Sequence, residues 1–319
     1  MNHYMIKKPE HGSNEWLYLR HRNENGQTRI AASEAAAVHG EHRFITKYGL
    51  AVAKMAEHPE VTEQNRAMER GNRLEPTLLR WLGDEIGVEL GEPKSMFALD
   101  APNYWLIATL DGVDEESSRW DCPPKVVAEI KTYNREWTGE LPPYWYWQGV
   151  QQAMCADVNE IIWGIFDRTL DLHVHHQKVS DSEKELHAAA CSDFLWFVHD
   201  LRTIPAEWPS TYDEIQRANL QVAGPTADIT EHAQLIARLR EVQANKKLLS
   251  DEEDQLKASI GSHLAGMEAG LVNGEIAVTW KQQSRKAFNT KQFEQDHPHL
   301  YELYQTNSTY RVMRLKGEK

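Results

Sequence analysis

Two strand-like segments with charged residues at their ends constrain the fold of this chain most strongly. Residues 104–110 (YWLIATL) form an apolar, β-branched and aromatic run that stops at Asp111, which is followed by glycine in a turn signal. Residues 126–131 (VVAEIK) predict a second strand, in which Glu129 and Lys131 share one face because side chains alternate across a strand. An acid and a lysine on an otherwise apolar strand are costly to bury unless they serve a purpose. The pattern therefore predicts a polar site at the edge of a buried sheet.

These charged residues suit metal-dependent phosphodiester hydrolysis. The carboxylates of Asp111 and Glu129, brought together by adjacent strands, are hard oxygen ligands for Mg²⁺ or Mn²⁺. Lys131 beside them can orient an attacking water or neutralise charge that develops on a phosphoryl group. The same spacing also arises by chance in acidic proteins, as a surface turn and an edge strand with a solvated ion pair. Both interpretations stay open on these residues alone.

A helix is predicted around Glu75. Leu74, Leu78, Leu82 and Ile86 recur every four residues and form one buried stripe. Glu75 lies beside this stripe and can reach a site at the edge of a sheet. The alternative is a first-turn acid that is favoured by the helix dipole alone.

A second helix is predicted after Pro143, since proline favours the first turn of a helix. Gln148, Gln151 and Gln152 then share one face. Amides at this spacing can bond to phosphate or to a metal-bound water, or they can be solvated helix surface.

The N-terminal segment contains a candidate anion site. Ser33 precedes the alanine-rich run 35–38 and is predicted as the N-cap of a helix. A helix N-terminus with a serine hydroxyl, together with Arg20 and Arg43, would bind an anion. The alternative is an ordinary capped helix with two surface arginines.

The order of these segments resembles that of one family. W-x3-R, AAS-E, G-x2-LE-P, LDG, EIK and Y-x3-Q follow one another as in the YqaJ-type viral recombinase nucleases, which include the phage lambda exonuclease and belong to the PD-(D/E)xK superfamily. The resemblance covers about residues 14–200, and the combination is specific where each motif alone is not. It implies an α/β fold with a central mixed β-sheet flanked by helices, the restriction-endonuclease-like core.

The resemblance also implies roles for individual residues at the carboxylate site. Asp111 and Glu129 match the metal-binding carboxylates of the family, and the backbone carbonyl of Ile130 matches a further ligand. Lys131 matches the catalytic lysine. Glu75 matches the helical glutamate that assists metal and water binding.

The remaining matches concern the bound DNA. Gln148 matches the glutamine near the scissile phosphate, and Arg20, Ser33 and Arg43 match the pocket that holds a 5′-phosphate. The sequence departs from the family directly after the first glutamine, where residues 149–151 (GVQ) replace the commoner Val-x-Gln order. This departure leaves the roles of the next two glutamines open.

The net charge of −13 argues against an open DNA-binding surface, because neutralisation of phosphates usually requires a basic face. One explanation is that basic residues face an enclosed channel, as in the rings that members of the family form around DNA. The other is that the protein handles DNA transiently and with metal. The sign of the charge does not decide between them.

Cysteine usage and hydropathy predict a cytoplasmic protein. The three cysteines are odd in number and far apart (Cys122, Cys155 and Cys191), which fits a reduced compartment and counts against the iron-sulfur relatives of the superfamily. No run of about eighteen apolar residues is present, and residues 1–8 lack the apolar core of a signal peptide. We therefore expect a cytoplasmic protein without a membrane partner. The family resemblance implies, in addition, a phage or prophage protein in a bacterial host cell.

The chain is predicted to have three parts: a nuclease domain at residues 1–204, a linker at 205–227, and a C-terminal helical and α+β extension at 228–319. The nuclease domain is expected to end in a helix at residues 182–201, with Leu186, Phe194, Leu195 and Val198 facing inward.

The extension opens with a heptad pattern. Leu235, Val242, Leu249 and Leu256 repeat every seven residues, and a second row is interrupted by Lys246 and Glu253. One long helix and a hairpin of two helices fit this pattern equally well. A strand at 275–281, a helix at 290–304 and a strand at 310–315 are expected to follow. The extension is either an appendage that guides DNA or forms oligomers, or a small solvated α+β domain.

The sequence as a whole predicts a Mg²⁺-dependent DNA nuclease, with Mn²⁺ as the alternative metal. The resemblance implies a 5′→3′ exonuclease that acts on linear double-stranded DNA ends, forms a homo-oligomeric ring, and passes a 3′ single strand to a phage single-strand annealing protein. An endonuclease or nickase of the same superfamily would share every catalytic residue but lack a functional phosphate pocket. A non-catalytic DNA-binding scaffold is the third alternative, and the intact carboxylate and lysine set argues against it.

Overall fold

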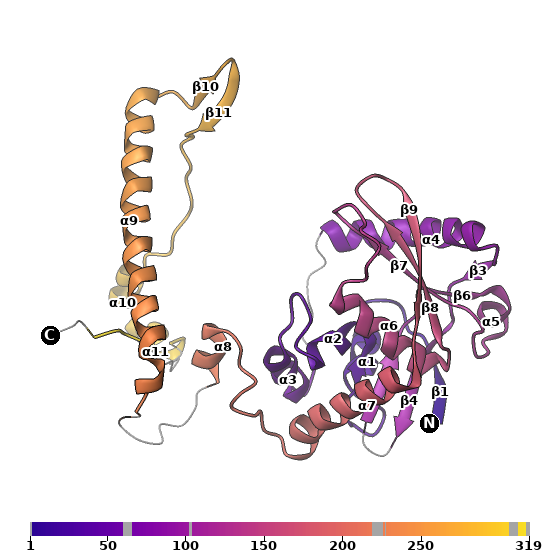
Figure 1. Ribbon diagram of the computed structural model, residues 1–319. Helices are drawn as coiled ribbons and strands as arrows, with labels where there is room; N and C mark the ends of the chain where they lie inside the picture. Colours follow the sequence, from indigo (N-terminus) through magenta and orange to yellow (C-terminus); the bar gives the residue numbers. More distant parts are fainter. Residues whose placement is uncertain are drawn as a thin grey trace. The chain divides into compact units, whose positions relative to one another are not determined.

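Residues 2–59, 66–101, 104–218, 226, 228–305 and 312–316 are described by the computed structural model of the chain (Figure 1). The chain divides into two units, residues 1–218 and 219–319, and each is described by itself. Within the described ranges, no helix combines the length and the apolarity needed to cross a membrane.

A five-stranded mixed sheet forms one layer of the first unit, in the order β3-β6-β7-β8-β9. Its strands are β3 (Leu90–Gly91), β6 (Gly112–Asp114), β7 (Val127–Thr132), β8 (Glu160–Phe166) and β9 (Leu172–Lys178). β7 and β8 are parallel, and the other pairs are antiparallel. Residues 161–165 of β8 are all buried, as expected for a strand that is covered on both faces.

A second, four-stranded sheet has the order β1-β4-β5-β2. Its strands are β1 (Asn2–Lys7), β4 (Ser95–Ala101), β5 (Tyr104–Ala108) and β2 (Ile30–Ala31). The single central sheet that we expected is therefore two hydrogen-bonded sheets. The chain leaves β5 at Ala108 and enters the other sheet at Gly112, so that Asp111 lies in the crossing segment. The predicted α/β class, with mixed sheet flanked by helices, is confirmed.

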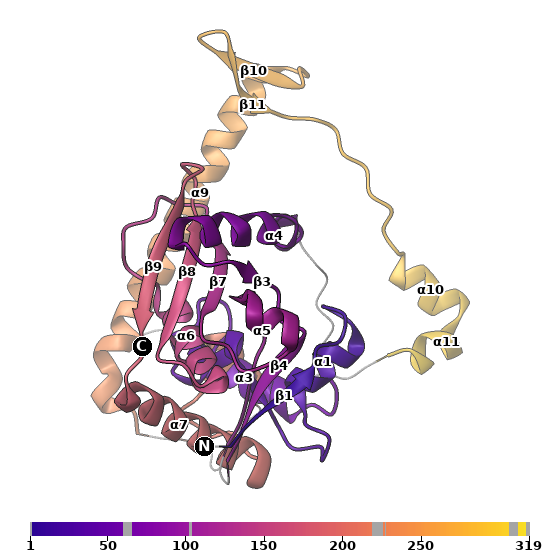
Figure 2. The same ribbon diagram turned by 90° about the vertical axis from the view of Figure 1, so that its right-hand side faces the viewer.

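Helices cover both faces of the five-stranded sheet. Helix α4 (Arg66–Ile86) lies across β7, β8 and β9 (Figure 2). Its stripe, which includes Leu78 and Leu82, packs on Ala128 and Ile162, so the predicted helix around Glu75 is confirmed. Helix α6 (Pro143–Ala156) belongs to a separate core cluster with β8, and helix α7 (Asp181–Leu195) packs against α6.

The end of the first unit differs from the prediction in detail. The expected helix at 182–201 is α7 followed by a π-helical turn, Trp196–Asp200. Three of the four residues predicted to face inward are buried: Phe194, Leu195 and Val198. Leu186 is instead 58% exposed, because His187 and Cys191 occupy the inward face of this helix.

The predicted N-cap at Ser33 is wrong. Ser33 lies inside a 3₁₀ turn (Ala32–Glu34) that runs directly into helix α2 (Ala35–Val38), and Glu34 precedes α2 without a side-chain capping bond. The Ser33 hydroxyl is used elsewhere, because it accepts a hydrogen bond from Arg20. Three further helices of the first unit are α1 (Asn14–His21), α3 (Lys47–Met55) and α5 (Glu115–Trp120).

A helix occurs within the stretch predicted as a linker. Helix α8 (Tyr212–Arg217) belongs to the first unit, and its Glu214 accepts a hydrogen bond from the Thr46 hydroxyl. Residues 219–225 and 227 of the predicted linker lie outside the described residues.

The second unit begins with a short 3₁₀ turn (Thr230–His232) and helix α9 (Ala233–Leu264). The structure thus shows one long helix and not a hairpin of two. A β-hairpin of β10 (Ala269–Val272) and β11 (Glu275–Thr279) follows, which confirms the predicted strand at 275–281 up to Thr279.

The last elements are shorter than predicted. The expected helix at 290–304 is split into α10 (Thr290–Asp296) and α11 (Pro298–Leu303), because Pro298 cannot donate a backbone hydrogen bond. The expected strand at 310–315 is absent from residues 312–315, and residues 310–311 lie outside the described part of the chain.

Candidate active site

Asp111 and Glu129 are brought together by the pairing of β6 with β7. These strands are antiparallel, with Gly112 opposite Ala128. The same register, continued by one residue, places Asp111 opposite Glu129. The Asp111 carboxylate also accepts a hydrogen bond from the backbone N–H of Ile130, with Oδ2 at 2.9 Å. Two carboxylates therefore meet where the chain passes from one sheet to the other.

The carboxylate of Glu129 is buried and surrounded by donors. Its Oε1 accepts hydrogen bonds from Lys131 Nζ at 2.6 Å and from Gln148 Nε2 at 2.5 Å. Its Oε2 accepts from Gln152 Nε2 at 2.6 Å. Only 2% of Glu129 is exposed, so these donors replace the water that the charge loses on folding. Both glutamines are buried, and neither forms solvated helix surface.

Neighbouring charges shift the protonation equilibria of this cluster. Burial, and then the charges of Glu129 and Glu75, raise the pKa of Asp111 well above its usual value. Burial and the charge of Glu129 likewise raise the pKa of Glu75. Burial alone would lower the pKa of Lys131, but Glu129 and Asp111 outweigh it, so the net pKa of Lys131 is raised and the amine stays protonated. The carboxylates outnumber the lysine, and added positive charge would stabilise the cluster.

The donor set fits a hard divalent cation. Among the described residues, no three His, Cys, Asp or Glu side chains enclose a metal position by themselves. Mg²⁺, however, is commonly held by one or two carboxylates, while water and substrate phosphates complete the octahedron. Asp111 and Glu129, with the Ile130 carbonyl, satisfy that requirement. In the part of the chain that the structure describes, two buried oxygens have no hydrogen-bond partner: Oε1 of Gln152, whose Nε2 donates to Glu129, and Oγ1 of Thr109, two residues before Asp111.

Gln151 has a different role from its neighbours on α6. Its Nε2 donates to the carbonyls of Ile30 at 2.8 Å and Ile107 at 3.0 Å, and its Oε1 lies 3.0 Å from His187 Nε2. Gln151 is completely buried. It therefore holds β2 and β5 against α6 and does not contact the carboxylate pair through these bonds.

The N-terminal segment contains the second polar site. Arg20 Nη2 donates to Ser33 Oγ at 2.5 Å, and its guanidinium lies 4.2 Å from the ring centroid of Trp16. Burial lowers the pKa of Arg20, although a guanidinium remains protonated at neutral pH. Arg43 is exposed, and its guanidinium lies over the ring of Phe44. The structure thus joins Arg20 to Ser33 and leaves Arg43 apart from them among the contacts of the described residues.

Residues 15–159 match the family described as the YqaJ-like viral recombinase domain. This range contains both the carboxylate pair and the Arg20–Ser33 pair. This part of the chain is similar to the YqaJ-like viral recombinase domain, and we call it the YqaJ-like domain. The resemblance drawn from the sequence motifs is thereby confirmed.

Solved structures similar to this chain include two of one enzyme and one of another. The alkaline exonuclease LHK-Exo from Laribacter hongkongensis is 19% identical, with a TM-score of 0.45, over 59% of this chain and 94% of that chain. LHK-Exo in complex with dAMP has the same identity and coverage and a TM-score of 0.46. The phage related exonuclease from Haemophilus somnus 129PT is 8% identical, with a TM-score of 0.39, over 53% of this chain and 94% of that chain. No curated protein matches the sequence.

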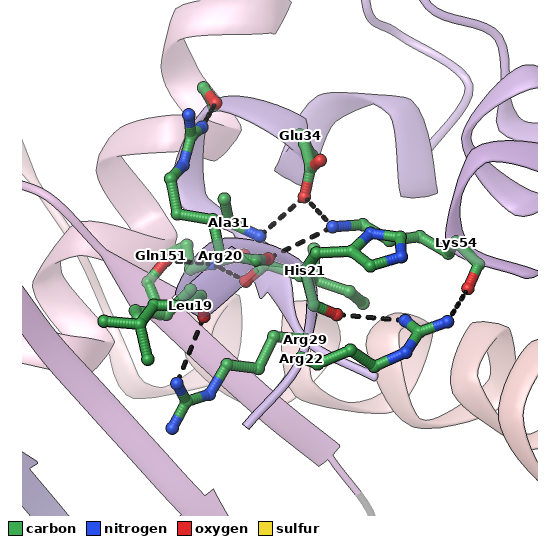
Figure 3. Close-up of polar contacts among 12 residues, drawn as sticks. Leu19, Arg20, His21, Arg22, Arg29, Ala31, Glu34, Lys54 and Gln151 are labelled. Carbon is green, nitrogen blue, oxygen red and sulfur yellow. Dashed lines mark hydrogen bonds and ion pairs between the residues drawn. The ribbon is translucent and has the colours of Figure 1, made fainter. Parts of the chain in front are cut away.

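Three buried basic residues fix the end of α1 in the YqaJ-like domain (Figure 3). The carbonyls of residues 19–21 accept hydrogen bonds from Arg29 Nη1 at 3.1 Å, Lys54 Nζ at 3.2 Å and Arg22 Nη1 at 3.0 Å, respectively. The last carbonyls of a helix have no partner within the helix, and basic side chains at this end also interact favourably with its dipole. The backbone at Arg20 is therefore held by basic side chains that are separate from its own guanidinium.

Lys54 connects this support to the segment that carries Ser33. Its Nζ lies 2.8 Å from Glu34 Oε2, and the same oxygen accepts a hydrogen bond from the backbone N–H of Ala31 at 2.7 Å. One buried amine therefore links the backbone of Arg20 to the residue next to Ser33 (Figure 3).

Sequence reasoning missed Lys54, and a signal for it was present. Lys54 follows Leu50 and Ala51 by four and three residues, which places a lysine on the apolar face of α3. A lysine on a buried helix face requires a partner, and only the fold shows that the partner is Glu34. Gln152 was considered, but its bond to Glu129 could not be derived from spacing.

Proposed function

We propose that the YqaJ-like domain is a Mg²⁺-dependent DNA nuclease that degrades linear double-stranded DNA 5′→3′ from its ends, with Mn²⁺ as the alternative metal. The observation that carries the proposal is the meeting of Asp111, Glu129 and Lys131 at one polar site, with Glu75 close enough to shift their protonation. This set combines oxygen ligands for a cation with a protonated amine, which is the combination that phosphodiester hydrolysis requires.

Each residue of the carboxylate site has a proposed task. Asp111, Glu129 and the Ile130 carbonyl hold the metal, with Glu75 as an additional ligand through water or directly. A bound Mg²⁺ would supply Lewis-acid polarisation of the phosphate and stabilise the leaving oxygen. Lys131, protonated through its contact with Glu129, orients the attacking water and donates to the phosphate oxygens.

Two further groups assist these steps. Burial and the charge of Glu129 raise the pKa of Glu75, which makes its carboxylate a stronger base. We assign to Glu75 the proton that the attacking water loses. Gln148 donates a hydrogen bond to Glu129 and is assigned a contact with the scissile phosphate.

End recognition is assigned to the second polar site. The guanidinium of Arg20 and the hydroxyl of Ser33 are already in contact and present donors to the oxygens of a 5′-phosphate. Arg43 is exposed, and we assign it a supporting contact with the same phosphate. A nuclease that holds a terminal phosphate cuts only from ends, which distinguishes it from an endonuclease with the same catalytic residues.

The proposed setting follows from the viral recombinase domain. The 3′ single strand left by resection would pass to a phage single-strand annealing protein in the bacterial cytoplasm. A homo-oligomeric ring around the duplex would place basic residues toward the DNA and would reconcile the net charge of −13 with DNA binding.

The test is digestion of a linear duplex with 5′-phosphates, in Mg²⁺ or EDTA, beside a covalently closed circle. We expect loss of the linear strands from their 5′ ends, an untouched circle and no reaction in EDTA. Lys131→Ala should abolish the reaction, whereas Lys125→Ala, a lysine paired with Glu116 at the surface, should retain it. Cutting of the circle would replace the exonuclease assignment by an endonuclease. Absence of cleavage in both Mg²⁺ and Mn²⁺ would reject catalysis.

A further inference from the structure

Helix α9 carries an apolar stripe that its own unit leaves exposed. The α9 stripe consists of Leu235, Val242, Leu249 and Leu256, whose exposed fractions are 68%, 45%, 65% and 58%. Among the described residues, Leu264 at the C-terminal end of the helix is buried, and Gly261 lies against Trp280 of the segment after β11. Nearer the N-terminal end, Arg240 donates a hydrogen bond to the Lys316 carbonyl. These contacts leave the α9 stripe exposed. Four large apolar side chains on one side of a 32-residue helix are far more than an isolated surface helix normally exposes.

The stripe has the period of a coiled-coil seam. Its residues recur every seven positions, so they occupy one of the two core positions of a heptad. The other core position is occupied by Leu239, Lys246, Glu253 and Ile260. The seam is thus apolar towards both ends, with one basic and one acidic residue in its centre.

The charges of α9 are divided between its two halves. Residues 233–247 contain four basic residues and one acidic residue, whereas residues 248–264 contain four acidic residues and one basic residue. The helix dipole favours the opposite order, with acids near the N-terminus and bases near the C-terminus. The observed order is therefore not explained by the stability of the single helix.

We propose that α9 pairs with α9 of a second copy of this chain in an antiparallel, two-stranded coiled coil. An antiparallel partner places the basic half of each helix beside the acidic half of the other. In an antiparallel pair, each core position of one helix packs beside the other core position of its partner, which places Lys246 of one copy beside Leu249 of the other and Glu253 beside Val242. These are neighbouring layers of the seam, so Lys246 of one copy lies next to Glu253 of the other, and the contact forms twice. A parallel partner would instead stack like charges at both positions.

The surface selects a second copy because it is complementary to itself. In this antiparallel register, Leu239 of one copy packs on Leu256 of the other, and Leu235 packs on Ile260, so the apolar ends of the seam cover each other. A parallel pair would also cover the apolar ends, but it would stack like charges in the centre. A nucleic acid would use the basic half but would leave the stripe and the acidic half uncovered. The proposal does not rest on the nuclease assignment.

The test is the mass of the full-length protein as a function of concentration, by sedimentation equilibrium in about 0.1 M salt. Lys246→Glu and Glu253→Lys should each weaken self-association by about tenfold, because each places like charges in both central contacts. The double variant Lys246→Glu/Glu253→Lys should restore it. Lys247→Glu is the matched control, since this lysine is one position away from the seam and should have little effect.

Leu249→Asp provides a second, independent disruption at the centre of the stripe, and circular dichroism should show that each variant retains its helices. Self-association through any other surface is the same in the single and double charge variants, so the rescue isolates α9. An unchanged mass in both single variants, or a double variant no better than either, would overturn the proposal. Equal losses of duplex DNA affinity in Lys246→Glu and Lys247→Glu, without a change of mass, would overturn it in favour of DNA binding.

Discussion

Replacement of Lys54 by methionine should remove the contact that joins the Arg20 backbone to Glu34, while most of the YqaJ-like domain stays folded. The amine of Lys54 is 2% exposed and contacts the Glu34 carboxylate, whose side chain is 22% exposed. Its second contact is the backbone carbonyl of Arg20 at 3.2 Å. Methionine fills a similar volume but makes neither contact.

The expected cost is worked from these contacts. Removing one partner of a buried ion pair costs about 3–5 kcal/mol, and the lower end applies because Glu34 is partly solvated and keeps its bond to the Ala31 N–H. Losing the hydrogen bond to the Arg20 carbonyl costs about 1 kcal/mol. Burial of the apolar methionine side chain recovers about 1–2 kcal/mol. We therefore expect a loss of about 2–3 kcal/mol of unfolding free energy.

The assay is urea denaturation followed by tryptophan fluorescence, which reports mainly on the first unit because ten of the eleven tryptophans lie before residue 219. Lys125→Met is the matched control, since its pair with Glu116 is largely exposed on both sides and its loss should not be measurable. A double-mutant cycle with Glu34→Gln should show coupling between positions 34 and 54.

Function should change in the same direction. Release of the α1 end lets the Arg20 guanidinium move, so digestion of 5′-phosphorylated duplex should fall by about tenfold in kcat/KM while 5′-hydroxyl duplex is affected less. If Lys54→Met costs no more stability than Lys125→Met, or if the cycle with Glu34→Gln shows no coupling, the interpretation of this contact as a support for Arg20 is refuted.

Four further predictions concern the carboxylate site and the buried glutamines of α6. Asp111→Asn should abolish cleavage yet raise the free energy of unfolding at pH 8. Because the pKa of Asp111 is raised in the folded state, its contribution to stability is fully present below its ordinary pKa of 3.8 and is lost as the pH rises through the folded pKa. Urea denaturation at pH 4 and pH 8 should therefore show the gain only at the higher pH. Lys131→Met should lower the single-turnover cleavage rate by at least about a thousandfold, while electrophoretic mobility shift shows that duplex binding persists. Gln151→Leu should cost about 2–3 kcal/mol in urea denaturation, because two buried carbonyls lose their donor. Gln152→Leu should reduce activity more than stability, since its amide orients Glu129.

The elements around the carboxylates could be predicted because they depend on local patterns. The stripe that includes Leu78 and Leu82 defines α4, and the alternation around Glu129 defines β7. The Asp111 turn was also visible, since an apolar run ends there. What the pattern could not show is that this turn joins two different sheets, because hydrogen bonding between strands depends on segments far apart in the sequence.

The errors have a common physical cause, which is competition between local and tertiary partners. Ser33 has the local signature of an N-cap, but its hydroxyl accepts from Arg20, and Glu34 bonds to the Ala31 N–H and to Lys54 instead of capping α2. Leu186 has the right polarity for an inward position, but the helix phase is set by His187, which contacts Gln151 in the core. Distant partners of this kind leave no trace in residue spacing.

The two polar sites of the domain are built in opposite ways, and the difference bears on their proposed roles. Around Arg20, buried charges are matched: Lys54 with Glu34, and three helix carbonyls with three basic side chains. Such a site is rigid before any ligand binds, which suits a pocket that measures the position of a DNA end. At Asp111 the charges are not matched, because neighbouring carboxylates raise its pKa and that of Glu75. A cation that binds there would relieve the repulsion between the carboxylates, and this relief would add to the free energy of metal binding. A preformed site for a DNA end and a carboxylate cluster that a metal would complete are the two parts that the proposed end-dependent nuclease would need.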